Sequence, residues 1–419
     1  MSTEEMDHVE READLAWELY EALPTHPEVP RLALRVLAAS PQRSGMRILL
    51  ARHHEALDEF DAAREVLLDL AGRQDQQFVN AARALRDLAI TMRDHDEALR
   101  WAEVVLRHEQ EDWYDHMRLG VATTLATDLE TGWRRMDDAV DMCARTDPDS
   151  LPYAYTHRAL FLLVTYAPVP RFLDAAQRAL EANPADEFLT HALAYAYLHE
   201  YRLDDAEQHL LGILRADPTD EIAPSLLKMT RTVQAKLEKH EVTVELLRQQ
   251  GLMELAWGHM RAKEAGTTLA DALAALDDLL PDALRAALHP PADRRTAAES
   301  HGSPEVAAWH DGQQAGTGAL WGEGNTFRLL SAAEVAAMDD AIEQEPEAFP
   351  QWDADGSYYL QVLTDDVGSY LIEGPRGALY RRSADGDVEI APSVADWFWD
   401  RVADFGGADP RPAALRSSH

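Results

Sequence analysis

Apolar residues recur at helical spacing along the first 250 residues, and the segments that they form end at regular intervals. Pro148, Pro184 and Pro218 stand at three of these ends, 36 and 34 residues apart. Because proline disfavours helical geometry in the residue before it, each proline marks the end of a helix. Two apolar faces lie between the last two prolines: Leu193, Ala194 and Tyr197, then Ala206, Leu210, Ile213 and Leu214. The pattern predicts stacked helix pairs, since one pair alone cannot bury its apolar face.

The same frame extends upstream and predicts roughly six units. The positions that end them are 33, 36, 38, 36 and 34 residues apart: Pro41, Gln74, Gln110, Pro148, Pro184 and Pro218. The small, aromatic and proline positions resemble the tetratricopeptide (TPR) repeat over residues 25–235, which implies an all-α solenoid that binds another macromolecule. Generic helical hairpins would give a similar spacing. We expect a TPR-like repeat domain over residues 1–250 and a helical cap or linker over 251–287.

The pattern of residues changes near residue 290, where glycine, aromatic and β-branched residues become frequent. Short strands are predicted at 327–330, 358–363, 369–373, 379–383 and 388–390. Ser331 and Glu334 form a capping box that begins a helix, and Asp385-Gly386 is a strong hairpin signal. A last helix follows Ser393. These elements predict a C-terminal α+β domain with a mainly antiparallel sheet over 288–405, followed by a disordered tail over 406–419.

Four segments of this second region resemble the SUKH (SMI/KNR-like) superfamily over about 285–405. They are Pro290-Pro291-Ala292, Trp309-His310-Asp311-Gly312, Phe327 to Ser331 with Glu334, and Ala391-Pro392-Ser393 with Asp396-Trp397-Phe398. Many bacterial SUKH proteins are immunity proteins that neutralise toxins by direct binding, and others are regulatory interaction modules. The resemblance therefore implies a binding domain that needs no catalytic residues.

The charge of the chain narrows the class of partner. Its 39 basic and 75 acidic residues give a net charge of −36, and residues 301–419 alone carry 7 basic and 21 acidic residues. Phosphate contacts need clustered Lys and Arg, so direct binding to nucleic acid or to an anionic membrane is not expected. A basic protein, such as a nuclease toxin, would be attracted. Solubility or salt adaptation would also explain the acidity. Lysine is scarce: Lys228, Lys236, Lys239 and Lys263.

Three features of the sequence bear on where in the cell the protein is expected. No run approaches 18 consecutive apolar residues, and the acidic N-terminus lacks the segments of a secretory signal. The single cysteine, Cys143, excludes an intramolecular disulfide and a Cys-based zinc cluster. We expect a cytoplasmic protein, and the abundance of arginine and alanine is typical of a GC-rich bacterial genome.

Aromatic and acidic residues of the second region are the candidate partner-binding residues. They are Trp309, Asp311, Trp321, Glu323, Trp352, Asp353, Asp355 and Tyr358. Exposed aromatic residues would form binding hot spots, whereas the alternative is that they build the core of a small domain.

No pattern of residues predicts catalysis, a cofactor or a metal. The glycines around Gly316 lack the Lys-Ser/Thr step of a phosphate loop, and Asp353 to Gly356 begins a calcium-loop pattern with Thr364 at its twelfth position. The histidines lack the i, i+4 metal spacing, and no serine lies in a G-x-S-x-G elbow. A hydrolase using Asp365 and Asp366 is the remaining enzymatic alternative, although adjacent strand residues point to opposite faces.

These observations predict a non-enzymatic protein-binding protein. The SUKH resemblance favours an immunity protein that binds a toxin. The alternative is a TPR adaptor or regulatory scaffold, in which the SUKH-like domain is an accessory interaction module.

Overall fold

The computed structural model describes residues 3–73, 77–292, 303–314, 327–344, 360–366, 369–374, 377–383 and 386–416. The chain divides into two compact units, one of residues 1–154 with 412–414 and the other of residues 155–411 with 415–419. Because this division falls inside the repeat region, the domain boundaries at residues 250 and 287 stay predictions.

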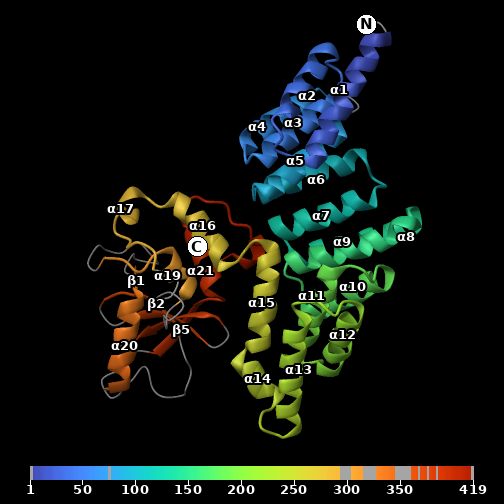
Figure 1. The fold of residues 1–419 in the computed structure, drawn as a ribbon. Helices are drawn as coiled ribbons and strands as arrows, with labels where there is room; N and C mark the ends of the chain where they lie inside the picture. Colours follow the sequence, from blue (N-terminus) through green and yellow to red (C-terminus); the bar gives the residue numbers. More distant parts are fainter. Residues whose placement is uncertain are drawn as a thin grey trace. The chain divides into compact units, whose positions relative to one another are not determined.

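The first unit consists of antiparallel helix pairs in which each helix packs on the next (Figure 1). Its helices are α1 (Thr3–Ala22), α2 (Glu28–Ala39), α3 (Ser44–Ala56), α4 (Phe60–Gly72), α5 (Phe78–Thr91), α6 (His95–His108), α7 (Trp113–Ala126) and α8 (Leu129–Thr146). A 3₁₀ turn (Pro148–Ser150) leads into α9 (Leu151–Val164), which spans the division between the units.

The helical part of the second unit continues the pairing. Its helices are α10 (Val169–Ala182), α11 (Glu187–His199), α12 (Leu203–Ala216), α13 (Ala223–Glu238), α14 (Val244–Gln250) and α15 (Leu252–Ala265). Helices α10 to α13 pack in sequence order, and α15 packs against α11.

The predicted repeat frame is confirmed. The second helices of the six pairs end at Ala39, Gly72, His108, Thr146, Ala182 and Ala216, each two residues before a predicted terminal position. Before the prolines, Asp147, Asn183 and Asp217 leave helical geometry, with ψ of 68°, 84° and 98°. Proline clashes with the preceding residue in the helical conformation, so the period of the prolines becomes the period of the helix pairs.

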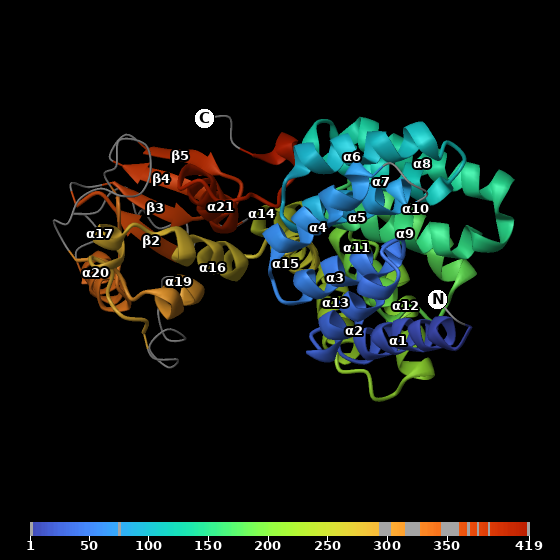
Figure 2. The same cartoon turned by 90° about the horizontal axis from the view of Figure 1, so that it is seen from above.

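The C-terminal part of the second unit is a small α+β domain. Its elements are α16 (Leu269–Leu279), α17 (Asp282–Arg285), α19 (Pro304–Trp309), β1 (Arg328–Leu329), α20 (Ala332–Gln344), β2 (Leu360–Thr364), β3 (Tyr370–Glu373), β4 (Leu379–Ser383), β5 (Gly386–Ala391) and α21 (Val394–Asp404). The five strands pair antiparallel in the order β1-β2-β3-β4-β5, which confirms the predicted antiparallel sheet. Figure 2 shows β2 to β5 side by side in this order. A last 3₁₀ turn covers Ala413–Leu415.

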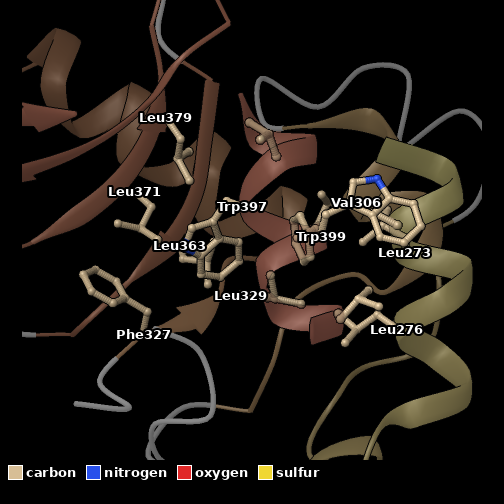
Figure 3. Packing of buried hydrophobic residues seen from close by; sticks show 14 of the residues in the cluster. Leu273, Leu276, Val306, Phe327, Leu329, Leu363, Leu371, Leu379, Trp397 and Trp399 are labelled. Atoms are coloured by element: carbon tan, nitrogen blue, oxygen red, sulfur yellow. The ribbon is translucent and has the colours of Figure 1, made fainter. Parts of the chain in front are cut away.

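One apolar cluster holds this domain together (Figure 3). Leu329, Leu363 and Leu371 of the strands meet Trp397 of α21, and Leu273 and Leu276 of α16 pack on the other side of α21. The segment 251–287, which we predicted as a cap or linker, therefore contributes α16 to the core of the α+β domain. The sequence predicted that this segment is helical but not the surface against which it packs.

Residues 406–416, where we predicted a disordered tail, are held by buried ion pairs. The guanidinium of Arg411 contacts carboxylate oxygens of Asp396 at 3.0 Å, Asp400 at 2.5 Å and Asp409 at 2.7 Å. Its side chain is only 2% exposed. Three carboxylates compensate the buried charge and fix this segment to α21, a tertiary effect that the polar local sequence does not reveal.

The crossing of α7 and α8 depends on two glycines. A Cβ atom added at Gly132 would lie 2.7 Å from the backbone oxygen of Gly120 and 2.7 Å from the backbone nitrogen of Thr124. Neither backbone atom can move without separating the two helices. Glycine at position 132 therefore allows the closest approach within this helix pair.

We expect Gly132→Ala to destabilise the full chain by about 1–3 kcal/mol, because the added methyl group overpacks this crossing. Gly45→Ala is the matched control in the same unit, since nothing lies within 4 Å of a Cβ atom there. Urea denaturation followed by circular dichroism measures both. Equal midpoints for the two variants would contradict the close-approach explanation.

Candidate functional site

Two of the eight predicted partner-binding residues lie in the described part of the chain. Trp309 is half-buried and packs edge-on against Phe398, with ring centroids 6.2 Å apart. The Asp311 carboxylate accepts a hydrogen bond of 2.8 Å from the backbone N–H of Ala332, at the start of α20. These contacts give both side chains structural roles, and their part in binding stays a prediction.

The other six predicted residues lie outside the described residues: Trp321, Glu323, Trp352, Asp353, Asp355 and Tyr358. The glycine-rich segment 316–324 and the calcium-loop candidate 353–356 lie there as well.

The carboxylates of the hydrolase alternative belong to separate structural contacts. Asp366 accepts hydrogen bonds of 2.8 and 2.9 Å from Nε of Arg328. Asp365 accepts one of 2.7 Å from the backbone N–H of Ser369. Each carboxylate fixes a different part of the β2–β3 connection.

Three further observations concern metal binding, the reactivity of Cys143 and membrane-spanning helices. Within the described ranges, no group of three or more His, Cys, Asp or Glu side chains is placed to hold a metal ion. Cys143 is buried, and burial raises the pKa of its thiol, which disfavours the reactive thiolate. Across the same ranges, no helix combines the length and the apolar character that crossing a membrane requires.

An open groove lies along α13, and we call it the α13 groove. It has a volume of about 660 Å³. Its lining residues come from α13, the end of α12 and the turn after α13: Leu214, Pro224, Leu227, Lys228, Arg231, Thr232, Ala235, Lys236, Lys239 and Glu241. Four apolar residues lie among four basic residues and one acid, so the groove offers both an apolar surface and positive charge.

The two faces of α13 explain how the groove forms. Leu226, Thr230 and Val233 are buried at spacings of four and three residues, which places them on one face of the helix. Lys228, Lys236 and Lys239 are exposed. The apolar face packs against α12, and the helical repeat then directs the lysines toward solvent beside the end of α12.

The N-terminus of α13 is fixed by Asp220. Its carboxylate accepts hydrogen bonds from the backbone N–H groups of Ile222 at 2.9 Å and Ala223 at 2.7 Å, and contacts Nε2 of His191 on α11 at 2.7 Å. Burial alone would raise the pKa of Asp220, but the hydrogen bonds from Ala223, His191 and Ile222 hold that pKa below its usual value. The carboxylate is therefore charged at neutral pH, and it ties α13 to α11.

Two side-chain contacts hold the middle of α13 to α12. Arg231 pairs with Glu207 at 2.7 Å, and the Gln234 amide donates a hydrogen bond of 3.0 Å to Asp204. Both partners belong to α12. The groove is consequently built on a helix that is anchored at its start and along its length.

The distribution of lysine along the chain is a sequence signal for this site. The chain has four lysines, and Lys228, Lys236 and Lys239 all line the α13 groove. A locally basic surface in a chain of net charge −36 is recognisable from residue positions alone. The apolar floor of the groove cannot be recognised from the sequence, because Leu214 and Leu227 are brought to the same groove only by the packing of α12 and α13.

Comparisons with known proteins found no match among protein-family models or among curated proteins. Solved structures that show similarity are TPR-type helical-repeat proteins. A thermophilic TPR protein of Thermus thermophilus is 20% identical, with a TM-score of 0.32, over 45% of this chain and 99% of that one. An assembly chaperone of RpL4 (Acl4, residues 1–338) is 13% identical, with a TM-score of 0.35, over 56% of this chain and 99% of that one.

The Cut9–Hcn1 hetero-tetramer of the APC/C is 15% identical, with a TM-score of 0.28, over 52% of this chain and 51% of that one. TM-scores of this size do not establish a shared fold. The helical-repeat assignment therefore rests on the helix pairs and their period within this chain.

We expect Asp220→Ala to loosen α13, because two backbone N–H groups at its start lose their acceptor and His191 loses its partner. The loss of such a cap costs about 1 kcal/mol. Amide hydrogen exchange should accelerate roughly fivefold in α13. Glu238→Ala, an exposed change on the same helix, is the control. Unchanged exchange in Asp220→Ala would show that α13 is not held by this contact.

Proposed function

We propose that this protein is a non-enzymatic protein-interaction scaffold whose helical-repeat array binds a partner in the α13 groove. The observation that carries the proposal is the groove itself, which is open to solvent and has an apolar floor and a basic rim. Helical repeats expose extended surfaces because each unit contacts only its neighbours. A partner segment in the groove would bury apolar side chains on the floor and place polar groups against the rim.

The geometry of the groove suits a segment of protein better than a small molecule. Small-molecule sites enclose most of their ligand, whereas the α13 groove runs along the outside of a helix. Grooves of this kind accept a helix or an extended peptide, whose apolar anchors recur at regular spacing.

A second candidate function is the immunity role that the SUKH resemblance implies, with the α+β domain binding a toxin. It rests on the sequence resemblance alone, whose segments lie on β1, α20 and α21 and on the chain around α19. The absence of a matching family model places it second.

Site-specific photo-crosslinking tests the scaffold. With p-benzoylphenylalanine in place of Thr232, an exposed residue of the groove, irradiation of the cells that produce the protein should yield a discrete adduct with another protein. The same amino acid in place of Arg107, which is exposed on α6, is the control and should not give that adduct. Identical adducts at both positions, or none at Thr232, would contradict the proposal.

Growth rescue tests the immunity role. If the α+β domain neutralises a toxin, co-expression with a toxin encoded by a neighbouring gene should restore growth, and the rescue should survive removal of residues 1–250. A neighbourhood without a toxin gene, or toxicity that the full chain does not relieve, would exclude this candidate.

A further inference from the structure

The α13 groove carries positive charge that the chain itself does not neutralise. Among the described residues, no ion pair joins Lys228 or Lys236 to a carboxylate, whereas Arg231 is held by Glu207 at 2.7 Å and Lys239 lies 4.0 Å from Glu241. Both unpaired lysines are exposed and line the groove. Two ammonium groups are thus available to a partner.

We propose that the α13 groove binds an acidic segment of a partner protein, with an apolar side chain on Leu214 and Leu227 and carboxylates against Lys228 and Lys236. The inference rests on the proposed scaffold function and adds the chemistry of the partner. Lys228 and Lys236 are eight residues apart, so about 12 Å of helix axis separates them. Leu214 and Leu227 lie near the start of α13, before both lysines, so an apolar anchor with two carboxylates on one side of it matches this arrangement.

Charge complementarity selects an acidic partner at this site even though the whole chain is acidic. Beyond a Debye length of about 8 Å at physiological salt, the net charge of the chain is largely screened, and the nearby lysines dominate within the groove. The ammonium groups would set the register of the segment and speed its association, while the apolar floor would supply burial.

The same charges argue against a nucleic acid as the occupant. A nucleic acid extends a dense line of phosphates well beyond the groove, where it would meet the other charges of a chain with net charge −36. The four basic residues of the groove are confined to α13 and the turn after it, from Lys228 to Lys239. A few carboxylates on a short peptide fit this limited footprint, and the apolar floor has no counterpart in a phosphate backbone.

Fluorescence anisotropy with the full chain tests the proposal. The probe is a fluorescein-labelled peptide of roughly 14 residues, about four helical turns, made of Glu, Leu and Ala with leucines on one face and glutamates beside them. Its matched control has Gln in place of every Glu. We expect the Glu peptide to bind at least about tenfold more tightly than the Gln peptide, and its affinity to fall as salt is raised.

Two charge-reversal variants compare a lysine inside the groove with a lysine outside it. Lys236→Glu should weaken binding of the Glu peptide at least about tenfold, because the charge in the groove is reversed. Lys263→Glu changes the net charge of the chain equally but lies on α15, outside the groove, and should change the affinity less than about twofold. Both lysines are exposed, so both variants should fold, which circular dichroism checks.

Each other result overturns the proposal in a recognisable way. Equal binding of the Glu and Gln peptides, with loss of both in Ala235→Trp, would show an apolar groove without charge selection. Equal losses in Lys236→Glu and Lys263→Glu would show a general effect of net charge. Tighter, Lys236-dependent binding of a single-stranded oligonucleotide would assign the groove to nucleic acid.

The scaffold function has a separate criterion. If the photo-crosslinker at Thr232 captures a partner whose crosslinked segment is not acidic, the scaffold stands and the acidic-segment inference fails. If no partner is captured while the Glu peptide still binds through Lys236, the groove chemistry stands and the scaffold function loses its support.

Discussion

The packing of one face of α13 against α12 is the constraint on which the α13 groove depends. Leu226, Thr230 and Val233 must leave water, and the helical repeat then leaves Lys228 and Lys236 on the exposed side. The groove therefore follows from the packing of α13 against α12, and no further helix or strand is needed to form it. In a continuing array, the exposed face of α13 would pack against the next helix pair. Here α14 and α15 follow α13, and α15 packs against α11.

Arginine and lysine have separate roles in this acidic chain. Buried guanidinium groups connect elements: Arg86 pairs with Asp115, Arg328 with Glu334 and Asp366, and Arg411 with three aspartates. The planar guanidinium can bind several carboxylates at once, which suits it to such networks. Lysine, a compact charge on a flexible stem, is gathered mainly at the α13 groove. Part of the acidity thus serves internal pairing, whereas Lys228 and Lys236 have no carboxylate partner among the described residues.

The sequence predicted the features that local physics determines. Prolines at a regular period placed the ends of the helix pairs, and the capping box at Ser331 with Glu334 formed as expected. Long-range packing was not accessible: neither the docking of α16 on α21 nor the burial of Arg411 has a local signature. The predicted binding residues followed a family resemblance that drew attention to the C-terminal loops, whereas the groove depends on the contact between α12 and α13.

A charge-swap cycle at the groove tests the central claim most directly. The four affinities needed are those of the unaltered chain and Lys236→Glu, each with the acidic peptide and with a peptide in which one glutamate is replaced by lysine. If a carboxylate of the bound segment lies against Lys236, each single change weakens binding, and the two changes together restore at least about tenfold of the lost affinity. If the losses of affinity from the two single changes simply add in the combination, whichever glutamate is replaced, the result would contradict the proposed contact.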